Sequence, residues 1–169
     1  IDKLGGMDLF LLSSGIGFQN MDLNMEVELN TAHTNVAGFI RMVDTAFTYF
    51  KKNGGGHLAI ISSIAGTKGL GVAPAYSATK RFQNTYIDAL EQLSYLQKLH
   101  IRFTDIRPGF VDTAMAKGEG LFWVTPVDKA VKQIKKAISK KKKVAFISKR
   151  WRYVTILFRL LPSAIYCRM

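Results

Sequence analysis

The sequence is poor in the residues that build covalent or metal-bound frameworks. It contains one cysteine, Cys167, and three histidines among its 169 residues. A single cysteine excludes an internal disulfide and any site built from several thiolates, and it is consistent with a reducing compartment. His33, His57 and His100 lack the spacing that is typical of zinc ligands. We therefore expect a cytoplasmic protein without a metal site.

Acidic residues are missing from the last quarter of the chain. Residues 129–169 carry 13 Lys or Arg and no Asp or Glu, whereas residues 1–128 carry 11 basic and 12 acidic residues. The net charge of +12 therefore comes almost entirely from the C-terminal region. Such a basic run is typical of a solvated helix face, and it also suits an anionic membrane surface or nucleic acid.

Long apolar runs are absent as well. No run approaches the roughly 20 residues that a membrane-spanning helix needs. Residues 151–169 (WRYVTILFRLLPSAIYCRM) form a basic amphipathic tail, which Arg159 interrupts and Pro162 bends. Its apolar face comprises Trp151, Val154, Phe158, Leu161 and Ile165. This face could pack on the chain's own body, on an oligomer partner, or at the surface of an anionic membrane, to which the protein would be peripheral.

Short apolar runs bounded by turn residues indicate four strands that are buried on both faces. They are residues 8–13, 57–63, 101–107 and 144–147. Three helical patterns lie between them: residues 36–50, residues 76–98, and a third helix that starts with a Thr125 cap, Pro126 and Asp128. This alternation predicts an α/β fold with a largely parallel sheet.

One pair of side chains suggests acid–base chemistry. Tyr76 and Lys80 are four residues apart and therefore share a helix face. A phenol has a pKa of about 10, and an ammonium fixed about 4 Å away would lower it by roughly three units at an effective dielectric of about 20. An ordinary amphipathic helix, with a packed Tyr and a solvated Lys, fits the spacing too.

Further residues extend the pair to a pattern. Ser63 stands thirteen residues before Tyr76 at the end of the second strand, and Asn35 lies in the preceding helix. Residues 108–113 (PGFVDT) follow the third strand. In this order and spacing the set resembles the short-chain dehydrogenase/reductase family, with its Tyr-x-x-x-Lys motif, upstream Ser, helix Asn and Pro-Gly-x-x-x-Thr loop. The resemblance implies a Rossmann-like, doubly wound parallel sheet.

The resemblance covers residues 1–150 as the catalytic half of that domain, its C-terminal two thirds, and leaves residues 151–169 as a tail. The segment DLFLLSSGIG resembles the family's fourth strand and its Asn-Asn-Ala-Gly segment, with Ser13 and Ser14 in place of the Asn pair. The family's Gly-rich phosphate turn and first βαβ units have no counterpart in this sequence. We expect a piece of a longer chain that is inactive alone and self-associates through its edge strand or long helices.

The resemblance also implies roles for single residues. Tyr76 would be the general acid or base while NAD or NADP exchanges a hydride, and Ser63 would hold the substrate oxygen. Lys80 would lower the pKa of Tyr76 and bind the nicotinamide ribose, and Asn35 would anchor a water molecule linked to Lys80. The remaining implied cofactor contacts are Ser14, Gly15, Pro108, Gly109, Val111 and Thr113.

Several functional hypotheses remain open. The first is an NAD(P)-dependent oxidoreductase acting on a small-molecule alcohol or carbonyl, as a homo-oligomer and with no nucleic-acid partner. A second is a non-catalytic member that binds the cofactor or acts as a membrane-associated interaction protein. A third is a sugar-nucleotide epimerase or dehydratase, which also uses Tyr-x-x-x-Lys. Residues 114–124 (AMAKGEGLFWV), with Leu121, Phe122 and Trp123, form either a lid over the substrate or a packing segment.

Overall fold

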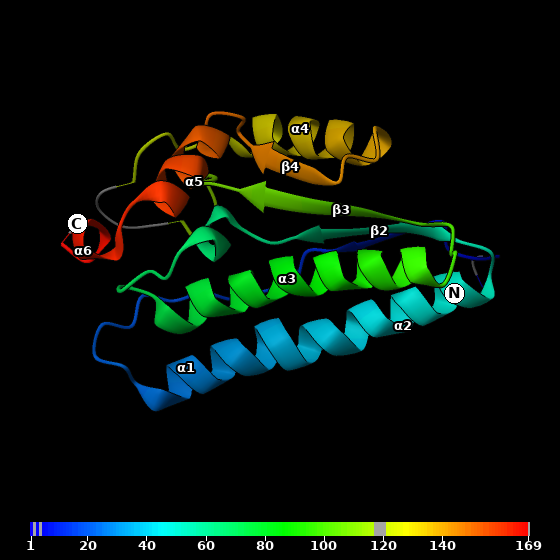
Figure 1. Ribbon diagram of the computed structural model, residues 1–169, viewed down its shortest axis with the longest axis horizontal. Helices are drawn as coiled ribbons and strands as arrows, with labels where there is room; N and C mark the ends of the chain where they lie inside the picture. The colour runs from blue at the N-terminus through cyan, green and yellow to red at the C-terminus, as the bar shows by residue number, and fades with distance from the viewer. Residues whose placement is uncertain (2, 4, 117–120, 169) are drawn as a thin grey trace.

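The computed structural model describes residues 1, 3, 5–116 and 121–168. Strands and helices alternate along the chain (Figure 1). The strands are β1 (Leu9–Leu12), β2 (Gly56–Ile61), β3 (Ile101–Pro108) and β4 (Val144–Ile147). They form one parallel sheet in the order β1-β2-β3-β4. The four predicted strands and the parallel α/β fold are therefore confirmed.

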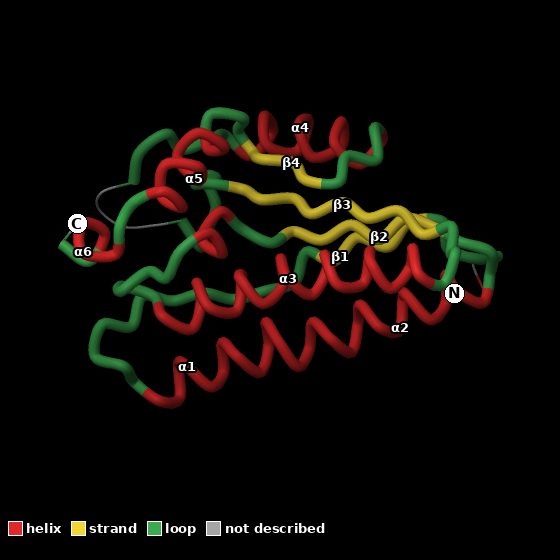
Figure 2. Tube along the Cα trace, viewed as in Figure 1, coloured by secondary structure: helices red, strands yellow, loops and turns green. Residues whose placement is uncertain are grey.

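The helices occupy the segments between and after the strands (Figure 2). α1 (Met25–Ala32), the π-helical segment η2 (His33–Gly38) and α2 (Phe39–Lys52) follow one another without a break. The others are the 3-10 turn η3 (Ile64–Thr67), α3 (Pro74–Leu96), α4 (Val127–Ser139), α5 (Trp151–Leu160) and α6 (Ser163–Tyr166). The first helical stretch begins well before the predicted residue 36, because the Asn24 side chain caps it by accepting from the Glu26 and Val27 N–H groups.

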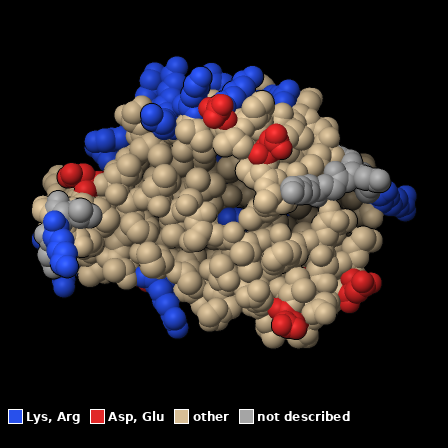
Figure 3. All heavy atoms as spheres, turned by 180° about the vertical axis from the view of Figure 1, so that it is seen from behind, with Lys and Arg blue, Asp and Glu red and all other residues tan. Residues whose placement is uncertain are grey.

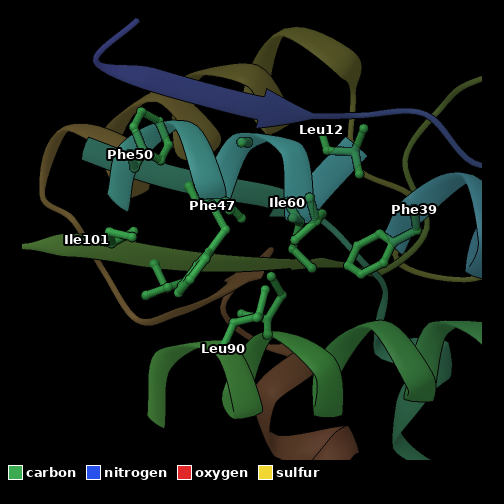
Figure 4. Close-up of a cluster of buried hydrophobic side chains, with 12 residues drawn as sticks. Leu12, Phe39, Phe47, Phe50, Ile60, Leu90 and Ile101 are labelled. Carbon is green, nitrogen blue, oxygen red and sulfur yellow. The ribbon is translucent and has the colours of Figure 1, made fainter. Parts of the chain in front are cut away.

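Helices cover both faces of the sheet. α2 and α3 lie on one face and α4 lies on the other (Figure 1). The larger core joins Phe39, Phe47 and Phe50 of α2 to Leu58 and Ile60 of β2 and to neighbours on β3 and α3 (Figure 4). The smaller core, under α4, comprises Ala59, Ile106, Ala130 and Ile147. Since all four strands are parallel, the loops after their carboxyl ends meet at one edge of the layered structure.

The first strand lies at an edge of the sheet, as expected from the sequence. β1 pairs only with β2 among the described residues. Leu9 and Leu11 remain 43% and 42% exposed. Leu9 is paired with His57 and Leu11 with Ala59, so both leucines lie on the face of the sheet that α4 covers. They are not part of the smaller core under α4.

The predicted Thr125 cap is wrong. α4 starts at Val127 with Pro126 as its N-cap residue, and no side chain caps it. Thr125 instead forms a parallel bridge with Val111, and its N–H donates to the Phe110 carbonyl over 2.9 Å. The backbone of Thr125 is extended in this bridge. Because α4 begins at Val127 with Pro126 as its N-cap, Thr125 lies one residue before the capping position.

The tail folds onto the body of the chain. Trp151 is 2% exposed, and Val154, Phe158 and Leu161 are partly buried, so most of the predicted apolar face packs on the chain itself. Ile165 does not share this face, because α5 ends at Leu160 and Ile165 is 52% exposed. Among the described residues, the structure contains no helix with the length and hydropathy to span a bilayer.

Candidate active site

The four residues predicted as catalytic come from three neighbouring segments. Ser63 is the second residue after β2 and caps η3, where its Oγ accepts from the Ala65 N–H over 3.1 Å. Tyr76 and Lys80 lie in the first turns of α3, which starts with Pro74. Asn35 lies in η2 and is fully buried. The carboxyl ends of β1 and β2 thus face the start of α3.

Tyr76 lies against the loop that follows β1. A Cβ on Gly17 would stand 2.4 Å from the Tyr76 ring, so only glycine permits this approach. Burial raises the pKa of Tyr76, and a hydrogen bond with the Ser63 side chain lowers it by less. The expected lowering of this pKa by Lys80 does not occur, because burial prevails and the Lys80 Nζ is 5.8 Å from the ring centroid. The phenol is therefore protonated at neutral pH.

Lys80 is a buried cation that forms no ion pair with any carboxylate of the described residues. Its side chain is held by neutral acceptors, because Nζ donates to the Ile61 carbonyl over 3.3 Å and to Gln83 Oε1 over 3.0 Å. Burial lowers the pKa of Lys80 to about 8, although the charge of Asp105 acts in the opposite direction. A Cβ on Gly15 would lie 3.2 Å from Nζ, so the loop after β1 passes directly over the ammonium.

Asn35 fixes that loop. Its Oδ1 accepts from the Ile16 N–H over 2.9 Å, and its Nδ2 donates to the Ile16 carbonyl over 2.7 Å. A further bond joins Nδ2 to Thr79 Oγ1 over 3.1 Å. The amide thus connects the loop after β1 to α3. Its position inside a π-helical turn, a feature often found at functional sites, places the side chain between the two.

Gln83 is a site residue that the sequence analysis missed. Its side chain joins Lys80 to Asn35, because Oε1 accepts from Lys80 Nζ and Nε2 donates to the Asn35 carbonyl over 2.9 Å. The water molecule that the family resemblance implies between Asn35 and Lys80 stays a prediction, and the Gln83 amide makes a direct link between the two residues. One signal was available, since a Gln three residues after Lys80 occupies a core-facing position where apolar residues are usual.

Ser62, the neighbour of Ser63, belongs to a different cluster. Its Oγ donates to Asp105 Oδ1 and lies 2.9 Å from the Asn84 Nδ2 donor. Asp105 also accepts from Asn84 over 2.9 Å and from Arg107 Nε over 2.7 Å. Ser63 is therefore the serine that faces Tyr76, while Ser62 stabilises a buried ion pair.

The other predicted cofactor contacts form hydrogen bonds of their own or face solvent. Pro108 ends β3, and the Gly109 N–H donates to the Ile147 carbonyl over 2.7 Å. Val111 is held in its bridge to Thr125, and Thr113 is exposed with its hydroxyl donating to the Val111 carbonyl. Ser14 is exposed after β1. No described hydrogen bond joins these residues to Tyr76 or Lys80.

The predicted lid is only partly described, because residues 117–120 lie outside the described ranges. Phe122 and Trp123 pack with Phe110 and Trp151, with ring centroids between 5.2 and 5.9 Å apart. Both side chains remain about half exposed. This aromatic cluster ties the end of the predicted lid to the loop after β3 and to α5.

The site fits the nicotinamide end of a dinucleotide. The glycines after β1 let the backbone of this loop pass close to Lys80 and Tyr76, where a Cβ would crowd both side chains. Lys80 has three donor protons and uses two in the described bonds, so one remains for a ribose hydroxyl. The residues that could hold such a group are Gly15, Tyr76 and Lys80, with Val111 and Thr113 as further candidates from the loop after β3.

Comparison with known proteins adds independent information. A family model described as short chain dehydrogenase matches residues 1–121. An uncharacterized oxidoreductase of Mycobacterium tuberculosis is 33% identical over 117 residues, which are 68% of this chain and 46% of that protein. The dehydrogenase/reductase SDR family member 7B of Danio rerio is 26% identical over 185 residues, covering 100% of this chain and 59% of that protein.

Solved structures show the same fold. A putative short-chain alcohol dehydrogenase from Sinorhizobium meliloti superposes with a TM-score of 0.62 at 24% identity, covering 69% of this chain and 46% of that one. The NADPH-dependent 3-quinuclidinone reductase from Rhodotorula rubra gives a TM-score of 0.60 at 22% identity, covering 70% and 46%. The chain thus spans about half the length of most of the proteins it matches.

Proposed function

Because this chain belongs to the short-chain dehydrogenase family, we propose that the full-length protein is an NAD- or NADP-dependent oxidoreductase that interconverts an alcohol and a carbonyl. Its relatives carry oxidoreductase names, and one structural neighbour is an NADPH-dependent reductase. Neither fact distinguishes NAD from NADP or names the substrate. The proposal therefore rests on the chemistry of the site.

The residues divide the proton chemistry among them. The nicotinamide supplies the hydride in the reductive direction. Tyr76, protonated at neutral pH because burial raises its pKa, donates the phenolic proton to the substrate oxygen. The Ser63 hydroxyl hydrogen-bonds the same oxygen and positions it. In the oxidative direction the tyrosine, as phenolate, accepts the alcohol proton.

Lys80 is proposed to offset part of the cost of forming the phenolate, although burial keeps the pKa of Tyr76 above its usual value. When Tyr76 gives up its proton, a negative charge develops on the phenolate. The Lys80 Nζ lies 5.8 Å from the centroid of the Tyr76 ring. The ammonium stabilises this charge more strongly than it would in water, since both groups are buried. With a pKa of about 8, Lys80 can also return a proton at physiological pH. Gln83 and Asn35 hold it in position.

One observation carries the proposal above all others. Lys80 is 4% exposed and is bonded to a carbonyl and an amide oxygen, and no carboxylate in the described part of the chain pairs with it. Burying such a cation is unfavourable, and a purely structural protein gains nothing from it. The arrangement favours the catalytic hypothesis over a non-catalytic member that only binds the cofactor.

Replacing the phenol tests the mechanism. In the full-length protein, assayed with NADH and NADPH on a panel of aldehydes and ketones, Tyr76→Phe should reduce kcat by about a hundredfold or more, because the general acid is lost. Tyr95→Phe is the matched control, since Tyr95 lies at the far end of α3 and is 84% exposed. Near-normal turnover of Tyr76→Phe would remove this residue from the mechanism.

The same assay separates the alternatives. A non-catalytic member would bind NAD or NADP in calorimetry and turn over no compound of the panel. An epimerase or dehydratase would regenerate its cofactor within each cycle, so it would convert sugar nucleotides without net oxidation or reduction of added nicotinamide. Net, stoichiometric oxidation of NADH or NADPH that depends on the carbonyl compound supports the oxidoreductase.

A further inference from the structure

α5 is apolar on two opposite sides. Its inner side packs on the body through Trp151, which is 2% exposed, and Thr155, which is 4% exposed. Trp151 stacks edge-on against Phe110 with ring centroids 5.5 Å apart. A Cβ on Gly109 would lie 2.1 Å from the Trp151 Nε1, so this side of α5 backs directly onto the loop after β3.

Polar contacts fix the far end of α5 in place. Lys68 Nζ donates to the Phe158 carbonyl over 3.2 Å and to the Leu161 carbonyl over 2.7 Å. These carbonyls belong to the last turn of the helix, where a cation also offsets the helix dipole. In addition, the Tyr166 hydroxyl donates to the Gly69 carbonyl over 2.5 Å. The inner side of α5 is therefore occupied by the chain itself, and its outer side is what remains available.

The outer side carries an apolar stripe. Tyr153, Ile156, Leu157 and Leu160 recur at helical spacing and are 74%, 46%, 57% and 76% exposed. Scattered exposed apolar residues are ordinary, but four that share one helix face form a contiguous patch. Such patches typically mark interaction surfaces, because apolar area left in water is unfavourable.

Positive charge borders this outer stripe. Arg152 and Arg159, seven residues apart and therefore on nearly the same side of the helix, are both exposed next to it. Within the described residues, neither forms an ion pair. No acidic residue occurs anywhere in residues 129–169. Lys side chains continue the basic surface along α4, where they gather at the upper margin of the molecule seen from behind (Figure 3).

We propose that the outer stripe of α5 docks onto the surface of an anionic phospholipid membrane. An apolar stripe flanked by arginines is the pattern of helices that lie in the membrane interface, with apolar side chains among the acyl chains and cations at the phosphates. A helix of ten residues, about 15 Å long, lies in the interface and cannot span it. A second copy fits less well, because two such basic surfaces repel each other.

The aromatic cluster adds a half-exposed tryptophan beside the start of α5. Trp123 is 45% exposed beside the first turn of α5, and the Arg150 guanidinium stacks on its ring at 4.9 Å while Nη2 donates to the Trp123 carbonyl over 3.0 Å. Half-exposed tryptophan is favoured at the level of lipid headgroups. Because Trp151 connects α5 to Gly109, the docked helix would hold the loop after β3 close to the membrane.

Co-sedimentation of the full-length protein with vesicles tests the proposal. Vesicles of phosphatidylcholine with phosphatidylserine should bind it, vesicles of phosphatidylcholine alone should bind it about tenfold or more weakly, and added salt should weaken binding to the anionic vesicles. The double variant Leu157→Asn/Leu160→Asn should weaken binding by about tenfold or more. Arg152→Gln/Arg159→Gln should weaken binding to the anionic vesicles by about tenfold.

The matched control removes the same residues at the same spacing from another surface. Leu93→Asn/Leu96→Asn, on the exposed end of α3, should leave vesicle binding unchanged. The proposal is overturned if anionic vesicles do not bind the protein, or if stripe and control variants lose binding equally. It is also overturned if light scattering shows that the stripe variants turn an oligomer into a monomer, because a second copy would then cover α5.

Discussion

Two buried cations near the carboxyl end of the sheet are treated in opposite ways. Arg107 in β3 is 7% exposed, and its guanidinium lies 2.7 Å from Asp105, which is itself buried. Lys80 in α3 is 4% exposed, and the hydrogen bonds it forms with the described residues go to uncharged oxygens. The two side chains are similar in burial and charge. They differ in whether the fold supplies a neutralising partner.

This difference separates a structural cation from a chemical one. The charge of Arg107 is compensated by the Asp105 carboxylate, and the surrounding Ser62 and Asn84 satisfy the remaining acceptor sites of Asp105. Lys80 has no such compensation, so burial lowers its pKa to about 8. A group that gains and loses a proton near physiological pH can take part in proton transfer. A guanidinium stays charged and cannot.

Removing the Asp105 carboxylate should produce the largest change in the free energy of unfolding. Asp105→Asn leaves Arg107 buried without compensation, and we expect the free energy of unfolding to fall by about 3–5 kcal/mol in urea titrations. Asp88→Asn, a change of charge at an exposed position of α3, should alter it by less than about 0.5 kcal/mol.

A second variant keeps this prediction testable if Asp105→Asn does not fold. Asp105→Leu/Arg107→Met removes both charges, and it should recover most of the lost stability because no uncompensated ion remains. If Asp105→Asn lowered stability by less than about 1 kcal/mol, the pair would not be the electrostatic anchor that its geometry indicates.

The second-largest expected effect is the change in the free energy of unfolding with pH that Lys80 causes. Between about pH 8 and 10 Lys80 is largely neutral when folded and protonated when unfolded, since its unfolded pKa is 10.5. The unfolded state then binds more protons, so stability rises with pH, by roughly 2 kcal/mol over this window. Below pH 8 both states are protonated and the contribution of Lys80 is constant. Urea titrations at a series of pH values measure the slope.

Lys80→Met is the matched variant for this slope. It should remove the rise between pH 8 and 10 and should be at least as stable as the native chain at pH 7, because an uncompensated buried cation is lost. Above pH 10 other groups intervene, since Tyr86, whose pKa is raised to about 12 by burial and by Asp44, destabilises the folded state there. An identical slope in both proteins would mean that Lys80 titrates normally.

The elements of the fold followed from local patterns, and each exception has an identifiable structural cause. The strands were recognisable because each is a short apolar run between turn residues. The start of the first helix was not, because Met25 to Ala32 has no apolar periodicity and depends on the Asn24 cap. The Thr125 cap was wrong because the β-bridge to Val111, a contact distant in sequence, takes precedence over a helix-start pattern.

The candidate site shows the same division. Tyr76, Lys80 and Ser63 were predicted by spacing along the chain, and the structure brings them together. Gln83 and the Asp105–Arg107 pair were missed, because their roles depend on which polar groups meet in three dimensions. The cofactor contacts predicted for Ser14 and Thr113 stay predictions, since both side chains are exposed and the described hydrogen bonds join neither to Tyr76 or Lys80.

The smallest expected effect on stability concerns an exposed ion pair. Lys143 Nζ lies 2.6 Å from Glu91 Oε2, but the two side chains are 63% and 35% exposed. The hydrogen bond to Glu91 raises the pKa of Lys143, so the pair stabilises the fold below pH 10.5 and this contribution is lost above it. Because water screens both charges, a double-mutant cycle of Glu91→Gln and Lys143→Gln should give a coupling free energy of about 0.5 kcal/mol that disappears in concentrated salt. A coupling above about 1.5 kcal/mol that resists salt would contradict this prediction. The strength of an ion pair would then depend on distance alone, and burial would not explain why the Arg107 pair is stronger than the Lys143 pair.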